Sequence, residues 1–96
     1  MKPSTALRIH PDALNAAIRR FRVANPRVFG SVLHGTDVDG SDLDLLVDPL
    51  PETTLFDLGG LQQALEDVLG VPVDVRTPGD LPERFRDAVL KQARPL

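Results

Sequence analysis

The segment 41–48, Ser-Asp-Leu-Asp-Leu-Leu-Val-Asp, constrains the fold more than any other part of the chain. Apolar and acidic side chains alternate along it, which is the pattern of a β-strand with one buried face. A strand over 42–47 turns Asp42 and Asp44 to one face, about 7 Å apart along the strand, with Leu46 beyond them. Three side chains would face the core: Leu43, Leu45 and Val47. This strand therefore belongs to a sheet with one covered face and one face that carries carboxylates.

The remaining patterns place helices and strands on both sides of this strand. They predict a helix over 12–24, a strand over 27–29, a helical turn over 32–34, a helix over 55–69, a strand over 71–76 and a helix over 81–93. Asn25-Pro26 is expected to end the first helix and Gly70 the second, while Asp80 and Glu83 resemble a capping box before the third. This order indicates an α/β fold in which helices cover a small mixed sheet.

Each longer helix carries an apolar stripe that identifies its buried face. The side chains expected to be buried are Leu14, Ala17, Ile18 and Phe21 in the first helix, Leu58, Leu61, Leu65 and Val68 in the second, and Phe85, Ala88 and Val89 in the third. With 42% hydrophobic and 26% charged residues, the 96-residue chain has the composition of a single globular domain over residues 1–96.

Composition also limits the classes of function. A net charge of −3 argues against a duplex-DNA binder, and the absence of Tyr and Trp argues against a platform that stacks single-stranded bases. Nucleic acid is therefore not expected as a direct partner. The absence of cysteine excludes disulfides and thiolate zinc sites. No apolar run has the length of a signal peptide or a membrane span, so we expect a cytoplasmic protein without a membrane partner.

Asp74 supplies a third carboxylate in a second strand-like segment. Val73 and Val75 flank it, and burial of both valines turns Asp74 to the opposite face. If strand 71–76 pairs with strand 42–47, the three aspartates share one face and can hold two Mg²⁺ ions about 3.5–4 Å apart. One ion would activate an attacking oxygen and the other would bind a triphosphate. The alternative is that each aspartate is simply solvated, but aspartate is depleted in strands and this one lies within an apolar run.

A second motif, Gly30-Ser31, follows a strand and precedes a short helical turn closed by Gly35. Glycine allows the backbone to approach a ligand closely, and exposed N–H groups at a helix start attract phosphate. The alternative is a plain turn with Ser31 as the N-cap. Ser41, which precedes the first aspartate of the strand, could bond the loop or a carboxylate, or could simply start the strand. A phosphate-binding turn beside a metal pair suits a nucleoside triphosphate.

Other charged residues near these motifs are expected to be structural or solvated. Arg76 lies on the same face of its strand as Asp74, where neutralising the acidic face is a simpler role than contacting phosphate. His34 is expected to be structural or solvent-facing. Three further acidic residues lie in a loop or at a strand end and are expected to be solvated: Asp37, Asp39 and Asp48.

Together these motifs resemble the nucleotidyltransferase superfamily of DNA polymerase β, and their spacing and the chain length resemble its minimal nucleotidyltransferase branch. The matching motifs are Gly30-Ser31-x-x-x-Gly35, Ser41-Asp42-x-Asp44 and Asp74. The stretches NPRVFGSV, TLFDLGGLQQALEDVLG and PVDVRTPGDLPERFRDAVL are also similar to that branch, so the resemblance covers nearly the whole chain.

The resemblance implies a polymerase β-like nucleotidyltransferase fold, ATP as donor and two Mg²⁺ ions. Asp42, Asp44 and Asp74 would be the ligands, and Asp74 would also help to deprotonate the acceptor hydroxyl. Members of this branch are typically encoded beside a HEPN-family ribonuclease toxin and act as its antitoxin by transferring AMP to a toxin tyrosine. One departure is Leu33-His34, where many relatives have Ala-Arg. Either the missing arginine weakens triphosphate binding or His34 substitutes for it.

Two alternatives belong to other functional classes. An adenylyltransferase of a small molecule, such as an aminoglycoside, would need a second domain for its acceptor, for which this chain has no room. A non-catalytic antitoxin would block the toxin by contact alone. The three intact carboxylates favour an active enzyme over that second alternative.

Overall fold

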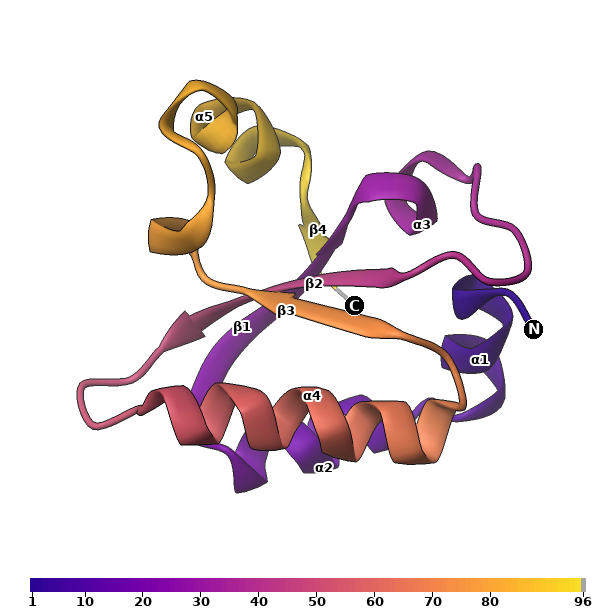
Figure 1. Cartoon of the computed structure of the whole chain (residues 1–96), viewed down its shortest axis with the longest axis horizontal. Coiled ribbons are helices and arrows are strands. Elements are labelled where there is room, and N and C mark those ends of the chain that lie inside the picture. Colours follow the sequence, from indigo (N-terminus) through magenta and orange to yellow (C-terminus); the bar gives the residue numbers. More distant parts are fainter. Residues whose placement is uncertain (96) are drawn as a thin grey trace.

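The computed structural model describes residues 1–95 and contains a four-stranded sheet with strand order β3-β2-β1-β4 (Figure 1). The strands are β1 (Val23–Phe29), β2 (Leu43–Pro49), β3 (Val73–Arg76) and β4 (Arg94–Pro95). The helices are α1 (Pro3–Ile9), α2 (Ala13–Arg20), α3 (Gly30–His34), α4 (Leu55–Leu69) and α5 (Glu83–Gln92), with a 3₁₀ turn η1 (Pro78–Asp80). β1 is antiparallel to β2 and β4, whereas β2 and β3 are parallel. The predicted mixed α/β sheet is confirmed.

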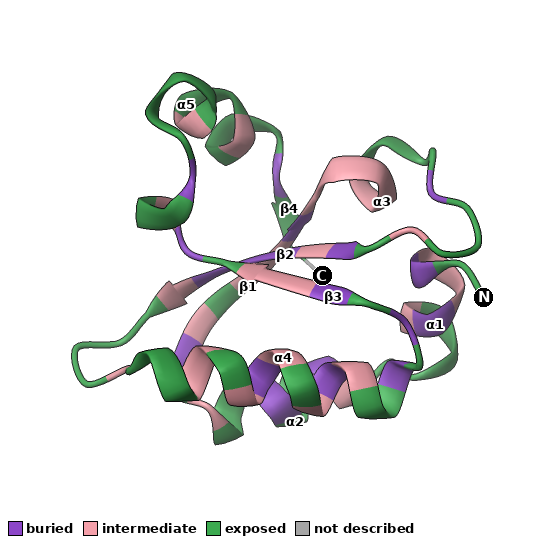
Figure 2. Cartoon of the chain, in the orientation of Figure 1, coloured by how far each residue is buried: buried purple, intermediate pink, exposed green. Residues whose placement is uncertain are grey.

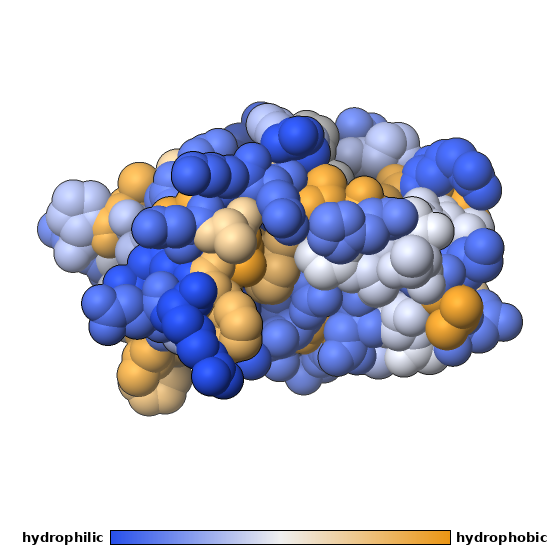
Figure 3. All heavy atoms as spheres, turned by 90° about the horizontal axis from the view of Figure 1, so that it is seen from above, coloured by the Kyte–Doolittle hydropathy of each residue, from blue (hydrophilic) through white to orange (hydrophobic). Residues whose placement is uncertain are grey.

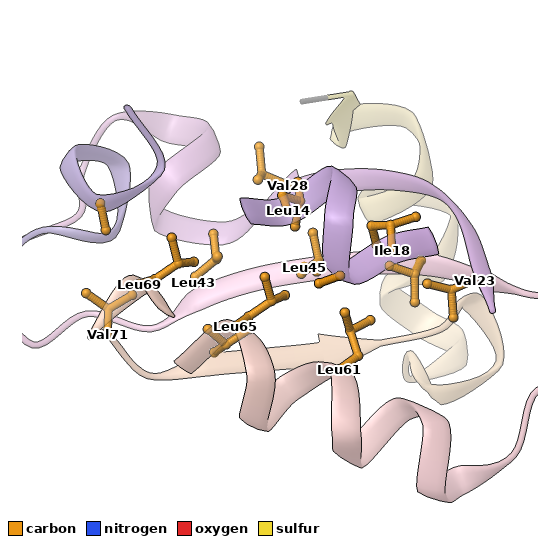
Figure 4. Close-up of a cluster of buried hydrophobic side chains, with 14 residues drawn as sticks. Leu14, Ile18, Val23, Val28, Leu43, Leu45, Leu61, Leu65, Leu69 and Val71 are labelled. Atoms are coloured by element: carbon orange, nitrogen blue, oxygen red, sulfur yellow. The ribbon is translucent and has the colours of Figure 1, made fainter. Parts of the chain in front are cut away.

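The main core lies between the sheet and helices α1, α2 and α4, which cover one face (Figures 1 and 4). The predicted core side chains of β2 are fully buried, and those of α2 are also buried except Phe21, which is partly buried. In α4, Leu61 and Leu65 are buried as expected, but Val68 is 48% exposed and Leu69 is buried instead. The apolar stripe of α4 therefore turns toward Leu69 near its end.

A smaller core lies on the opposite face of the sheet, beneath α5. Leu46 is fully buried there against Leu81 and Ala93, with Phe29 and Val89 packed around them. This cluster makes the carboxylate-bearing face apolar beyond the acidic pair, as predicted.

The predicted inward face of α5 is wrong for Phe85 and Ala88 and is confirmed for Val89 alone. Phe85 is 48% exposed, Ala88 is exposed, and no residue of α5 is fully buried (Figure 2). Only Val89 packs against the small core, while the residues that anchor this helix flank its two ends. An amphipathic sequence alone does not reveal that a helix is held at its ends rather than along its length.

The first predicted helix is shorter than expected, since α2 ends at Arg20 and β1 already begins at Val23. Arg22 and Asn25 have positive φ angles of 60° and 54°, so the backbone leaves helical geometry earlier. Asn25-Pro26 does not end a helix. It lies within β1, where the pairing with β2 shifts register.

The predicted capping box before the last helix is also wrong. Asp80 instead accepts hydrogen bonds from the backbone N–H and hydroxyl of Thr77, at 3.1 and 3.0 Å, and so caps η1. A capping box does open α4, between Thr54 and Asp57. Three short elements, α1, η1 and β4, were not predicted. Within residues 1–95, none of the helices combines the length and the apolar character needed to cross a bilayer.

Candidate active site

The three predicted carboxylates lie on the sheet face opposite the main core. β2 and β3 pair so that Asp44 is directly opposite Asp74, which is the pairing on which the predicted constellation depends. Asp42 immediately precedes β2 and is exposed, whereas Asp44 is half-buried. Two paired strands therefore hold Asp44 and Asp74 side by side. Asp42 lies two residues before Asp44 in the chain.

Electrostatics single out Asp44 within this group. Burial raises the pKa of Asp44, the neighbouring charges of Asp74 and Asp42 raise it further, and Arg76 acts in the opposite direction. A half-buried carboxylate beside two others concentrates negative potential, and a bound cation relieves that repulsion. The donor set of carboxylate oxygens is the one that Mg²⁺ prefers.

The residues fit a divalent metal in their chemistry, and their strands are adjacent, but their side chains are not gathered around one point. Among residues 1–95, no group of three or more His, Cys, Asp or Glu side chains is arranged closely enough to hold a metal ion. Asp74 is instead engaged by Arg76, whose Nε lies 3.1 Å from Oδ1 and 3.2 Å from Oδ2. Arg76 therefore neutralises the acidic face, as the sequence indicated.

The glycine turn reaches this face directly. Gly30 starts α3 with a φ of +69°, and a Cβ atom added to it would lie 2.1 Å from Oδ2 of Asp44. The cause is the register of the sheet, because Phe29 pairs with Asp44 and the chain turns into α3 at the next residue. Ser31 follows within the first turn of α3. The structure thus brings the predicted phosphate-binding turn and the carboxylates into one place.

Gly35 and Ser41 occupy supporting positions. Gly35 ends α3 in the left-handed conformation, with a φ of +70°, and a Cβ there would meet nothing within 4 Å. The Ser41 hydroxyl accepts a hydrogen bond from the Val38 N–H at 2.9 Å and so shapes the loop before Asp42. His34 is exposed at the end of α3. Of the two hydrogen-bonding roles that the sequence left open for Ser41, to the loop or to a carboxylate, the structure shows the bond to the loop.

The expectation that Asp37 is solvated is wrong. Its side chain is 7% exposed and accepts a hydrogen bond from the Ser4 N–H, at the start of α1, at 2.9 Å. This bond holds the pKa of Asp37 below its usual value. Asp39 is 84% exposed and pairs with the N-terminal amino group, while Asp48 bonds Arg27 at 2.6 Å. None of these three carboxylates joins the acidic group on β2 and β3.

The carboxylate face is open. Figure 3 looks onto the side that carries α3 and α5, where hydrophilic side chains cover most of the surface and apolar ones show in separate patches among them. A groove of about 630 Å³ lies between α2 and α4 on the other side of the sheet, where alanine and glycine make up half of its lining. This groove contains none of the predicted site residues.

Comparisons with known proteins identify the family of this chain. The model of the nucleotidyltransferase domain family matches residues 12–96. A Methanocaldococcus jannaschii protein, whose name proposes protein adenylyltransferase activity, is 35% identical over 71 residues, or 74% of this chain and 76% of its own length. The protein adenylyltransferase MntA of Thermococcus cleftensis is 34% identical over 73 residues, or 76% of this chain and 74% of its own.

Solved structures show the same fold. One, described as a proposed minimal nucleotidyltransferase, is 42% identical with a TM-score of 0.85 and covers 100% of this chain and 97% of its own. A chain from a crystal structure of a toxin–antitoxin with AMP-PNP is 21% identical with a TM-score of 0.73, covers 88% of this chain and 69% of its own, and supports the fold alone. The chain therefore belongs to the nucleotidyltransferase domain family, and its fold is that of the minimal nucleotidyltransferases.

Proposed function

We propose that this nucleotidyltransferase transfers AMP from ATP to a hydroxyl group of a protein acceptor, with two Mg²⁺ ions held by Asp42, Asp44 and Asp74. The observation that carries the proposal is the close approach of Gly30 to Asp44, because it joins a phosphate-binding turn to a metal-binding face. Protein transfer is supported by the two archaeal relatives, both named for protein adenylylation.

Each residue has a role that follows from its position. When bound, the metal ions would supply charge neutralisation and activate the attacking oxygen. The backbone N–H groups of Gly30 and Ser31 at the start of α3 would bind phosphate oxygens, and the missing Cβ of Gly30 leaves room for Asp44 beside them. Gly35 ends α3, and the Ser41 hydroxyl holds the loop that precedes Asp42.

The reaction is a substitution at the α-phosphorus of ATP. The acceptor oxygen forms a new bond to that phosphorus, the bond to the β-phosphate oxygen breaks, and pyrophosphate leaves. The acceptor proton passes to the carboxylate of Asp74 and from there to water. Asp74 suits this role because β3 lies at the edge of the sheet, on the side of Asp44 away from α3. The acceptor then approaches over β3 while the phosphates lie over α3.

We infer that the acceptor is a HEPN-family toxin and that this chain is its antitoxin. A small open site leaves little surface for gripping a substrate, so an acceptor with its own docking surface fits best. The fold neighbour in a toxin–antitoxin with AMP-PNP is consistent with such a setting. An added AMP carries negative charge and would repel the phosphates of an RNA substrate, so the toxin would lose activity.

The test is to mix the chain with its purified toxin, ATP and Mg²⁺. The expected result is an AMP mass increment on the toxin together with loss of toxin activity, and neither with Asp42→Asn. Asp39→Asn is a matched control, since it removes an exposed carboxylate outside the site. Toxin silencing by Asp42→Asn without a mass change would favour a non-catalytic antitoxin. Transfer to an aminoglycoside but not to the toxin would favour a small-molecule enzyme.

A further inference from the structure

We propose that Arg76 is an exchangeable counter-ion of Asp74, which holds this carboxylate in the metal-free protein and must leave before Asp74 can bind a metal ion. The inference rests on the metal site of the proposed function and adds a residue that sets its affinity. Arg76 would be a positioning residue, since it acts through Asp74.

The contact occupies the part of Asp74 that a metal would need. The Nε–H of Arg76 lies between the two carboxylate oxygens, at 3.1 Å from Oδ1 and 3.2 Å from Oδ2. With both oxygens facing Arg76, Asp74 is not gathered with Asp44, although their strands place them opposite each other. This arrangement accounts for the absence, among residues 1–95, of a carboxylate group already closed around a metal position.

The ion pair between Arg76 and Asp74 is exposed and weakly held. The side chains of Arg76 and Asp74 are 47% and 36% exposed, and the Arg76 side chain makes no hydrogen bond to any other residue within residues 1–95. An exposed pair of this kind stabilises a fold only slightly. The guanidinium of Arg76 can therefore leave Asp74 and move into solvent or onto a substrate phosphate.

A second arginine on the same face shows the contrast. Arg27 is 12% exposed, lies 2.6 Å from Asp48 through Nη2, and also donates from Nε to the Asn25 carbonyl. Asn25 in turn bonds the same carboxylate at 3.1 Å. That pair is fixed by a network and cannot be exchanged without disturbing β1. Arg76 has no such network.

Charge explains why the exchange would take place. A guanidinium is always protonated, so it cannot give way by losing its charge and must move when a cation binds beside it. Without metal, Arg76 offsets the repulsion among the three carboxylates. A divalent ion offsets it better, because it carries twice the charge and can contact several oxygens at once.

The first experiment measures Mg²⁺ binding by calorimetry without nucleotide. Arg76→Met should bind Mg²⁺ about fivefold more tightly than wild type, a gain matching the loss of one exposed ion pair. Arg19→Met removes an equal charge from the exposed face of α2 and should leave the affinity unchanged. An equal affinity for wild type and Arg76→Met, or an equal gain in both variants, would overturn the proposal.

The second experiment observes the arginine Nε–H groups by NMR during a Mg²⁺ titration of the wild-type protein. The Arg76 signal should shift and exchange faster with water, while the Arg27 signal should stay unchanged. If Mg²⁺ shifts the backbone signals of Asp42, Asp44 and Asp74 but leaves the Arg76 Nε–H unaffected, the counter-ion inference fails and the metal site stands. If Mg²⁺ shifts none of these signals, the metal site of the proposed function fails and the inference fails with it.

Discussion

Gly30 and Asp44 are so close that any side chain on the glycine would overlap the carboxylate, with its Cβ atom 2.1 Å from Oδ2. The two residues come from neighbouring strands, since Gly30 follows the last residue of β1 and Asp44 lies in β2. The turn and the carboxylate face that we propose to bind metal are therefore coupled, and a change in one is expected to alter the other.

Gly30→Ala should weaken both nucleotide and metal binding, because the added methyl group displaces Asp44. We expect Mg²⁺ and ATP affinities to fall at least about tenfold, as for other residues that orient metal ligands. The left-handed backbone, with a φ of +69°, should also cost about 1 kcal/mol in the free energy of unfolding. Calorimetry and urea unfolding measure these effects.

Gly70→Ala is the matched control for this prediction. Gly70 ends α4 with the same φ of +69°, but a Cβ there meets nothing within 4 Å. Its loss of stability should be similar, and its ligand affinities should equal those of wild type. Equal affinities in the two variants would show that the contact between Gly30 and Asp44 has no bearing on binding.

Asp44→Asn should lower the transfer activity and raise the stability of the metal-free protein. Burial and the charges of Asp74 and Asp42 disfavour the ionised carboxylate, so a neutral side chain of the same shape should raise the free energy of unfolding in EDTA. Transfer should fall at least about 100-fold, since a metal ligand supplies several kcal/mol of transition-state stabilisation. A variant that is less stable than wild type in EDTA, or that retains wild-type transfer, would contradict this explanation.

Much of the fold could be predicted because its central elements carry complete local signals. α4 was predicted with its observed bounds, since the apolar periodicity stops at Gly70, which adopts the left-handed conformation typical of a helix end. In β2, the alternation of apolar and acidic side chains identified both faces. The pairing of this strand with β3, which the sequence left as a condition, is present in the structure and places Asp74 opposite Asp44.

The parts that could not be predicted depend on contacts between distant residues. Asp37 caps α1 through Ser4, which is 33 residues away, so nothing near Asp37 in the sequence distinguishes it from a solvated loop residue. The overlap of Gly30 with Asp44 likewise follows from the register of β1 against β2, which motif spacing does not fix. Asn25-Pro26 has the composition of a helix stop, yet it forms an irregularity within β1.

The outer edge of β3 should be protected by two side chains of α4. Glu66 accepts a hydrogen bond from the Val73 N–H at 3.0 Å, and Gln62 accepts one from the Val75 N–H at 3.4 Å. Because unpaired strand edges promote self-association, Gln62→Ala combined with Glu66→Ala should form dimers or larger species. Each lost bond should also cost about 1 kcal/mol.

Light scattering after size-exclusion chromatography and urea unfolding test this prediction. Gln63→Ala is the control, since Gln63 is an exposed residue of the same helix whose side chain, among residues 1–95, bonds only Asp67. A double variant that stays monomeric and as stable as Gln63→Ala would show that these side chains do not protect the edge.

Asp37 should give the fold a dependence on acid pH. The hydrogen bond from the Ser4 N–H, with a smaller contribution from Lys2, lowers the pKa of Asp37 in the folded protein. A lowered pKa stabilises the fold above the usual value of an aspartate, about 3.9, and this stabilisation is lost as the pH falls through the folded-state value. Asp37→Asn should therefore be less stable than wild type at neutral pH, and the difference should close in acid. Urea unfolding across this pH range measures the difference, with Asp39→Asn as an exposed control from the same loop. A stability difference that stays constant down to the lowest pH at which both proteins fold would mean that the Asp37 side chain acts through packing rather than through its charge.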